Sequence, residues 1–122
     1  MLNLDTNVVA ALLNGSLRKD EVRAMDDDPH WAISAIVLWE VAMLHRAGRI
    51  GFGVDDPAFR SLLGQVDVLP LSLEVARQSQ RLDFSSDPAD EIIAATSIVF
   101  GAPLVTRDST LLASRIVPLA LA

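Results

Sequence analysis

Three carboxylates in this sequence stand beside or inside apolar segments, where a charged group needs a partner. Asp5 follows the apolar start of the chain, and Asp108 comes shortly after the apolar stretch 103–105. Glu40 is the only charged residue within 35–44, so its helical neighbours are apolar. An unpaired carboxylate in such surroundings would lose several kcal/mol of hydration or take up a proton. Each of these acids is therefore expected to face a cation or several hydrogen-bond donors.

A fourth carboxylate, Asp90, lies where the first turn of a helix is predicted. Asp87 followed by Pro88 is typical of a helix N-cap with proline at the first helical position, so we assign Asp87 a structural role. Asp90 then falls in the first turn, where the positive end of the helix dipole keeps a carboxylate ionised. Such an acid is either a simple complement to the dipole or a functional group.

The other three acids also have ordinary structural explanations when each is considered by itself. Asp5 and Asp108 can cap the helices that follow them, and Glu40 can form a structural salt bridge with an arginine. Small polar residues near the four acids are placed to support them through hydrogen bonds. These residues are Thr6, Asn7, Ser34 and Thr106.

Alternating strands and helices must position these acids. Short β-type runs predict strands at residues 2–5, 31–34, 66–71, 103–106 and 117–119. Capping patterns and glycine stops predict helices at residues 6–13, 35–47, 57–63, 72–82, 88–100 and 109–114. Strands that alternate with helices form right-handed βαβ units, so we predict an α/β fold with a mainly parallel sheet and helices on both faces.

The joint placement of the four acids is more informative than any one of them. Three are predicted at the carboxyl edge of one parallel sheet, where sites form in such folds, and Glu40 projects from a helix that packs on this sheet. Four converging carboxylates repel one another unless a cation lies between them. Oxygen ligands of this charge suit Mg²⁺ or Mn²⁺, which points to metal-assisted hydrolysis of a phosphodiester.

The composition bounds the class of protein. The chain has 122 residues, of which 51% are apolar, so we expect one folded domain spanning residues 1–122. It has no cysteine, which excludes disulfides and thiolate metal sites. Its net charge of −6 argues against nucleic-acid binding by bulk positive charge. We find no signal peptide and no apolar run long enough to span a bilayer, so we expect a soluble cytoplasmic protein.

Short motifs over nearly the whole chain resemble the PIN-domain family, especially the VapC-type toxins of bacterial toxin–antitoxin pairs. Each motif alone is weakly specific, but their order and intervals together are specific. The motifs are LDTN at 4–7, ISAI at 33–36, WEVA at 39–42, GRI at 48–50, DPAD at 87–90, IAAT at 93–96 and LVTRD at 104–108. The family commonly has arginine directly after the third acid, whereas this sequence has Glu91.

The resemblance implies a single PIN-like domain with a parallel five-stranded sheet, and a Mg²⁺- or Mn²⁺-dependent endoribonuclease activity. It implies that the catalytic and metal-binding residues are Asp5, Glu40, Asp90 and Asp108. It also implies a homodimer that is inhibited by a small antitoxin. Because a concentrated acidic pocket is a good receptor for a basic side chain, we expect the antitoxin to insert an arginine or lysine among these acids.

Other functions compete with this interpretation. A phosphoacceptor receiver domain needs a lysine late in the chain, but the only lysine is Lys19. An aspartyl-phosphate phosphatase would have a second aspartate two positions after the first, where this chain has Asn7. The remaining alternative is an inactive interaction module of the same fold whose acidic patch binds a basic protein. Arg46 and Arg49, which follow the helix of Glu40, either contact a phosphate or are simply solvated.

Overall fold

A parallel sheet of four strands forms the centre of residues 1–121, which the computed structural model describes. The strands are β1 (Leu2–Leu4), β2 (Trp31–Ser34), β3 (Asp67–Leu69) and β4 (Leu104–Val105). They lie in the order β3-β2-β1-β4, and all three pairings are parallel. β2 and β3 follow on one side of β1 and β4 lies on the other, so the winding reverses between β1 and β4.

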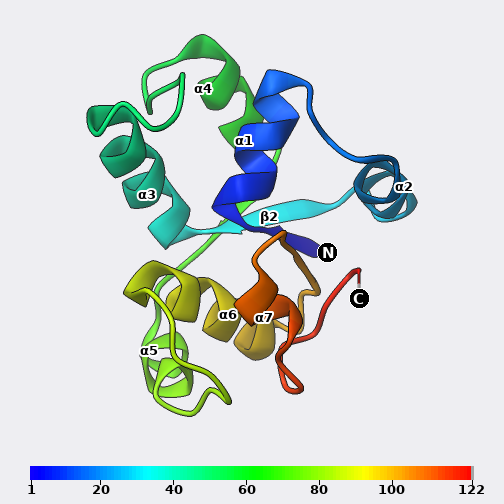
Figure 1. Ribbon diagram of the computed structural model, residues 1–122, viewed down its shortest axis with the longest axis vertical. Helices are drawn as coiled ribbons and strands as arrows, with labels where there is room; N and C mark the ends of the chain where they lie inside the picture. The colour runs from blue at the N-terminus through cyan, green and yellow to red at the C-terminus, as the bar shows by residue number, and fades with distance from the viewer. Residues whose placement is uncertain (122) are drawn as a thin grey trace.

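Helices cover both faces of this sheet (Figure 1). Within the described residues they are α1 (Thr6–Asn14), α2 (Lys19–Asp27), α3 (Ala35–Arg46), α4 (Pro57–Leu63), α5 (Leu73–Ser79), α6 (Pro88–Phe100) and α7 (Ser109–Leu112). In Figure 1, α1 and α2 lie on one side of the strands, whereas α5, α6 and α7 lie on the other. α3 follows β2 directly and contacts both α1 and α6. None of these helices is long and apolar enough to cross a membrane.

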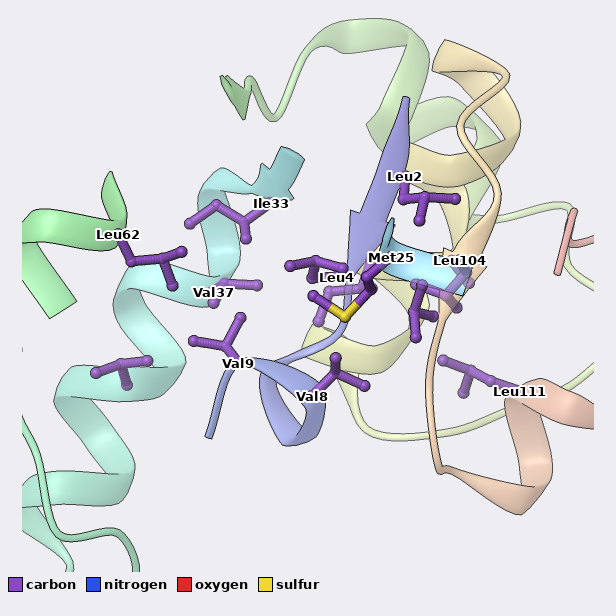
Figure 2. Close-up of a cluster of buried hydrophobic side chains, with 14 of the residues drawn as sticks. Leu2, Leu4, Val8, Val9, Met25, Ile33, Val37, Leu62, Leu104 and Leu111 are labelled. Atoms are coloured by element: carbon purple, nitrogen blue, oxygen red, sulfur yellow. The ribbon is translucent and has the colours of Figure 1, made fainter. Parts of the chain in front are cut away.

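Apolar side chains from the strands and helices form one core (Figure 2). Leu4 and Ile33 from neighbouring strands are fully buried in it, together with Val8 from α1 and Val37 from α3. Each such side chain contributes roughly 1.5–3 kcal/mol through its removal from water. The core thus anchors the end of β1 and the start of α1, between which Asp5 lies.

The α/β class with a parallel sheet is confirmed, but the strand count differs from the expected five. Residues 117–119 form only an isolated bridge between Leu104 and Leu119. The backbone N–H of Leu104 donates to the carbonyl of Pro118 at 2.8 Å, and that of Ala120 donates to the carbonyl of Leu104 at 2.9 Å. Pro118 has no N–H to donate and β4 is only two residues long, so this pairing does not extend into a ladder.

A second difference is α2, for which no helix is predicted. Only Glu21 and Met25 of its nine residues are buried, and the segment is too polar to show the broad apolar stripe by which a helix is predicted. Glu21 accepts a hydrogen bond from the backbone N–H of Arg18 at 2.7 Å and forms an ion pair with Arg107, far along the chain. The ion pair with Arg107 and the buried side chain of Met25 hold α2 on the domain, and the indole N–H of Trp31 adds hydrogen bonds to the carbonyls of Met25 and Asp28 at 3.0 and 3.1 Å.

Candidate active site

The acidic residues gather at the point where the winding of the sheet reverses. Asp5 follows β1 directly, and its backbone N–H donates to the carbonyl of Val105, the last residue of β4, at 3.0 Å. In parallel α/β sheets, a crevice forms outside the carboxyl ends of the strands at such a switch point. The fold therefore places Asp5 where a ligand site is expected.

Asp5 is only 3% exposed, and both of its carboxylate oxygens accept hydrogen bonds. Oδ1 accepts from the backbone N–H of Thr6 at 2.7 Å, so Asp5 caps α1, and Oδ2 accepts from the hydroxyl of Thr106 at 2.6 Å. Burial raises the pKa of Asp5 from 3.8 to about 6. The charges of Asp90 and Glu40 add to this increase, and the two hydrogen bonds oppose it. Asp5 thus caps a helix and also carries a destabilised charge.

Glu40 projects from α3 toward the start of α1. Its Oε1 accepts a hydrogen bond from the hydroxyl of Thr6 at 2.5 Å. Among residues 1–121, no arginine or lysine lies within ion-pair distance of Glu40, so the alternative of a structural salt bridge is wrong. Burial raises the pKa of Glu40, and the charges of Asp90 and Asp87 raise it further. Glu40 is therefore a partly buried carboxylate that a threonine positions and no protein cation neutralises.

Asp90 lies in the first turn of α6, as its spacing from Pro88 predicts. Its Oδ2 accepts a hydrogen bond from the hydroxyl of Ser86 at 2.9 Å. Burial raises the pKa of Asp90, and the charges of Asp108, Asp87 and Glu91 contribute. Glu91 itself accepts a long hydrogen bond of 3.4 Å from the backbone N–H of Ser86, so its carboxylate contacts the loop before α6.

One carboxylate oxygen from each of Asp5, Glu40 and Asp90 lies within 4.8 Å of the others. These three acids come from three elements, and only the tertiary structure brings them together. Burial and mutual repulsion both favour a bound cation, and the all-oxygen donor set suits Mg²⁺ or Mn²⁺. Asn7 lines the adjoining cleft, and its buried Oδ1 has no hydrogen-bond partner among the described residues, so one polar group beside the acids is left unsatisfied. The residues present therefore fit a hydrated divalent ion.

Asp108 lies near this group but is not one of its three members. Its Oδ1 accepts from the backbone N–H groups of Thr110 and Leu111, at 2.9 and 3.1 Å, so it caps α7. Its charge nevertheless reaches Asp90, whose pKa it raises. The capping interpretation is confirmed for Asp108, and its role as a metal ligand stays a prediction.

The support expected from small polar residues is present at two positions. Thr6 positions Glu40, and Thr106 positions Asp5. Thr106 also accepts a hydrogen bond from the backbone N–H of Asp108 at 3.0 Å, so one hydroxyl links two acids. Ser34 instead caps α3.

A cleft of about 790 Å³ opens beside the acidic group. The three acids line it, together with two arginines, Arg49 and Arg107. Its apolar and neutral lining includes Leu44, Ile50 and Phe52 from α3 and the loop that follows it, and Asn7, Ala10, Ala11 and Leu13 from α1. Asp108 and Glu91 do not line this cleft. The space exceeds what an ion needs and leaves room for part of a larger ligand.

Arg107 has a structural role that sequence reasoning missed. Its Nε and Nη2 donate to the two carboxylate oxygens of Glu21 at 2.8 and 2.7 Å, and Nη2 also donates to the carbonyl of Ser16 at 2.9 Å. The pair joins α2 to the segment between β4 and α7. The position of Arg107 directly before Asp108 is the only local signal, and nothing in the sequence links it to Glu21, 86 residues away.

The fold and the site define an α/β protein with an acidic, metal-type site at the carboxyl edge of a parallel sheet. The model of the PIN domain matches residues 3–115, so this chain belongs to the PIN-domain family. The family predicted from the sequence motifs is thereby confirmed. PIN domains are generally nucleases.

Solved structures show the same fold. A toxin–antitoxin complex from Klebsiella pneumoniae contains a chain that is 24% identical, with a TM-score of 0.67 over 93% of this chain and 91% of that chain. VapBC2 from Rickettsia felis, bound to a DNA fragment from its promoter, contains a chain that is 20% identical, with a TM-score of 0.73 over 98% of this chain and 96% of that chain. FitAcB from Neisseria gonorrhoeae contains a chain that is 21% identical, with a TM-score of 0.64 over 91% of this chain and 90% of that chain. A search of curated proteins finds no significant match.

Proposed function

We propose that this protein is a Mg²⁺- or Mn²⁺-dependent endoribonuclease that acts as the toxin of a toxin–antitoxin pair. The observation that carries the proposal is the convergence of Asp5, Glu40 and Asp90 within 4.8 Å, beside a cleft of about 790 Å³. Membership in the PIN-domain family supports a nuclease activity, and the similar solved structures are toxin–antitoxin complexes.

In this proposal, Asp5, Glu40 and Asp90 hold the ion, and Asp108 contributes directly or through water. An ion held there would supply positive charge for a phosphate oxygen and would lower the pKa of a water molecule for hydrolysis. Thr106 holds the carboxylate of Asp5, and Thr6 holds that of Glu40, so both acids are oriented before the ion binds. This preorganisation lowers the cost of assembling the site.

The test uses defined structured and unstructured RNAs, incubated with the protein in Mg²⁺, Mn²⁺ or EDTA, with the product ends mapped afterwards. We expect cleavage with either metal and none with EDTA, because three adjacent carboxylates cannot hold a phosphate without a cation. Adding metal in excess of EDTA should restore cleavage. A protein that binds the ion but cleaves no RNA would instead support the alternative of an inactive interaction module.

We also propose that an antitoxin covers the acidic group and inserts an arginine or lysine among the four acids. Such a side chain takes the electrostatic place of the ion, so the two compete. Raising Mg²⁺ at constant ionic strength should therefore weaken the complex with the cognate antitoxin, and replacing the inserted residue by alanine should reduce inhibition. If Mg²⁺ has no specific effect and the alanine variant inhibits fully, the antitoxin binds elsewhere.

A homodimer is a further part of the proposal. Trp39 and Met43 lie one turn apart on α3 and are 55% and 40% exposed, which is unusual for large apolar side chains. A second copy of the chain that covers this face of α3 would remove both from water. Since RNA is the proposed substrate, we place the activity in the cytoplasm.

A further inference from the structure

Two arginines line the acidic cleft, and they differ in what they bind. The guanidinium of Arg107 makes hydrogen bonds to Glu21 and to the carbonyl of Ser16, so it is committed to the fold. Arg49 forms no ion pair or side-chain hydrogen bond with any residue of the described chain. Arg49 is thus the cation of the cleft that is available to a ligand.

The backbone of Arg49 is held in place by the end of α3. Gly48 has a φ of 70°, a left-handed conformation that favours glycine, and it turns the chain back after the helix. The backbone N–H of Gly48 donates to His45 at 3.0 Å, and that of Arg49 donates to the carbonyl of Leu44 at 2.8 Å. This pair of bonds is a Schellman motif, in which the second residue after the C-cap, here Arg49, lies over the last turn of the helix.

The motif returns Arg49 to the same face of α3 that carries Glu40. Glu40 and Leu44 are four residues apart, so they share one face of the helix, and both line the cleft. Arg46, in the last turn of α3, and Arg49 are both exposed, but only Arg49 lines this cleft. The structure therefore separates two arginines that the sequence presents as equivalent.

The charge of the cleft indicates what Arg49 binds. Four carboxylates line the cleft, those of Asp5, Glu40, Asp56 and Asp90. A nucleic acid that enters it meets a negative surface, and an ion at the acidic group neutralises only the phosphate that reacts. A neighbouring phosphate needs a second cation, and a planar guanidinium suits phosphate oxygens.

We propose that Arg49 binds a phosphate of the RNA next to the one that is cleaved, and so positions the strand along the cleft. This inference rests on the proposed ribonuclease function. It makes Arg49 a substrate-binding residue and Arg46 an ordinary solvated residue at a helix end.

The experiment measures kcat/KM for cleavage of a single-stranded RNA oligonucleotide with Mg²⁺, across a series of KCl concentrations, for the unmodified protein and three variants. Arg49→Ala should lower kcat/KM by about 10- to 100-fold, as expected for a lost charge-assisted hydrogen bond. The slope of log kcat/KM against log KCl should become shallower by about 0.7, the contribution of one phosphate contact on a single strand. Arg49→Lys should keep the slope, because it keeps the charge.

Arg46→Ala is the matched control, since it removes the same charge from the same end of α3. It should change kcat/KM by less than about two-fold, and unfolding midpoints of all variants should match the unmodified protein, because the Schellman bonds are backbone bonds. If the unmodified protein cleaves RNA, and Arg49→Ala matches Arg46→Ala in both kcat/KM and its salt slope, the role of Arg49 is overturned while the proposed ribonuclease function stands. If the unmodified protein neither binds nor cleaves RNA, the proposed function fails, and this inference with it.

Discussion

Replacing Asp5 by asparagine is expected to abolish RNA cleavage and, in the absence of metal, to make the protein more stable. Losing an outer-sphere partner of a metal costs up to about 100-fold in activity. Asp5 is proposed to hold the ion itself, so its loss should reduce cleavage by at least about 100-fold. Stability should increase because burial makes the ionised Asp5 unfavourable, as its pKa of about 6 indicates. A shift of about two pKa units corresponds to about 1–3 kcal/mol above pH 6.

The pH dependence gives this prediction a second measurement. An acid with a raised pKa in the folded state binds more protons when folded, so the free energy of unfolding of the metal-free protein should fall as pH rises from about 4 to about 6. The Asp5→Asn variant should lack this contribution. Asp26→Asn, which changes an exposed acid of α2, is the control and should alter neither activity nor stability. Full activity in pure Asp5→Asn protein would remove Asp5 from the catalytic site.

Replacing Arg107 by alanine is expected to destabilise the protein by about 2–4 kcal/mol at pH 7, because it leaves a buried carboxylate unpaired. The side chain of Glu21 is only 3% exposed, and Arg107 holds its pKa below the usual value through two hydrogen bonds. Chemical denaturation measures the loss. Arg23→Ala, which removes an exposed arginine from α2, should change the free energy of unfolding by no more than about 0.5 kcal/mol.

Two further measurements attribute this loss to the charge of Glu21. The double variant Arg107→Ala/Glu21→Gln should recover at least half of the stability that Arg107→Ala alone loses. Glutamine is neutral and can still accept a hydrogen bond from the backbone N–H of Arg18. An acid with a lowered pKa stabilises the fold above its usual pKa and loses this contribution as pH falls through the lowered value. The difference in the free energy of unfolding between the unmodified protein and the variant should therefore narrow as pH falls below 4.5. A constant difference, with no recovery in the double variant, would show that lost packing rather than charge is responsible.

The sequence by itself determined the local features of this protein. Proline and glycine signals correctly place the start of α6 at Pro88 and the ends of α3 and α6 before Gly48 and Gly101. Such signals work because helix caps involve residues only a few positions apart. The four strands, the six helices other than α2, and the position of Asp5 at the carboxyl end of the first strand were predictable for the same reason.

The composition of the acidic group was decided by the tertiary structure. Four acids were predicted, but the structure brings together Asp5, Glu40 and Asp90 and uses Asp108 to cap α7. All four satisfy the same local pattern of an acid next to an apolar segment or in the first turn of a helix. Only the packing of α3 against α6 and the pairing of β1 with β4 determine which carboxylates meet.

Tertiary contacts also explain the two segments whose structure differs from the prediction, α2 and residues 117–119. α2 has too few apolar residues for its sequence to predict a helix. The ion pair between Glu21 and Arg107 helps to hold it, and no local sequence pattern predicts that pair. The apolar residues 117–119 resemble a strand, but Pro118 limits their pairing with β4 to one bridge. Local propensity acts over a few residues, whereas burial and pairing across the chain depend on the whole fold, and here the long-range contacts determine both outcomes.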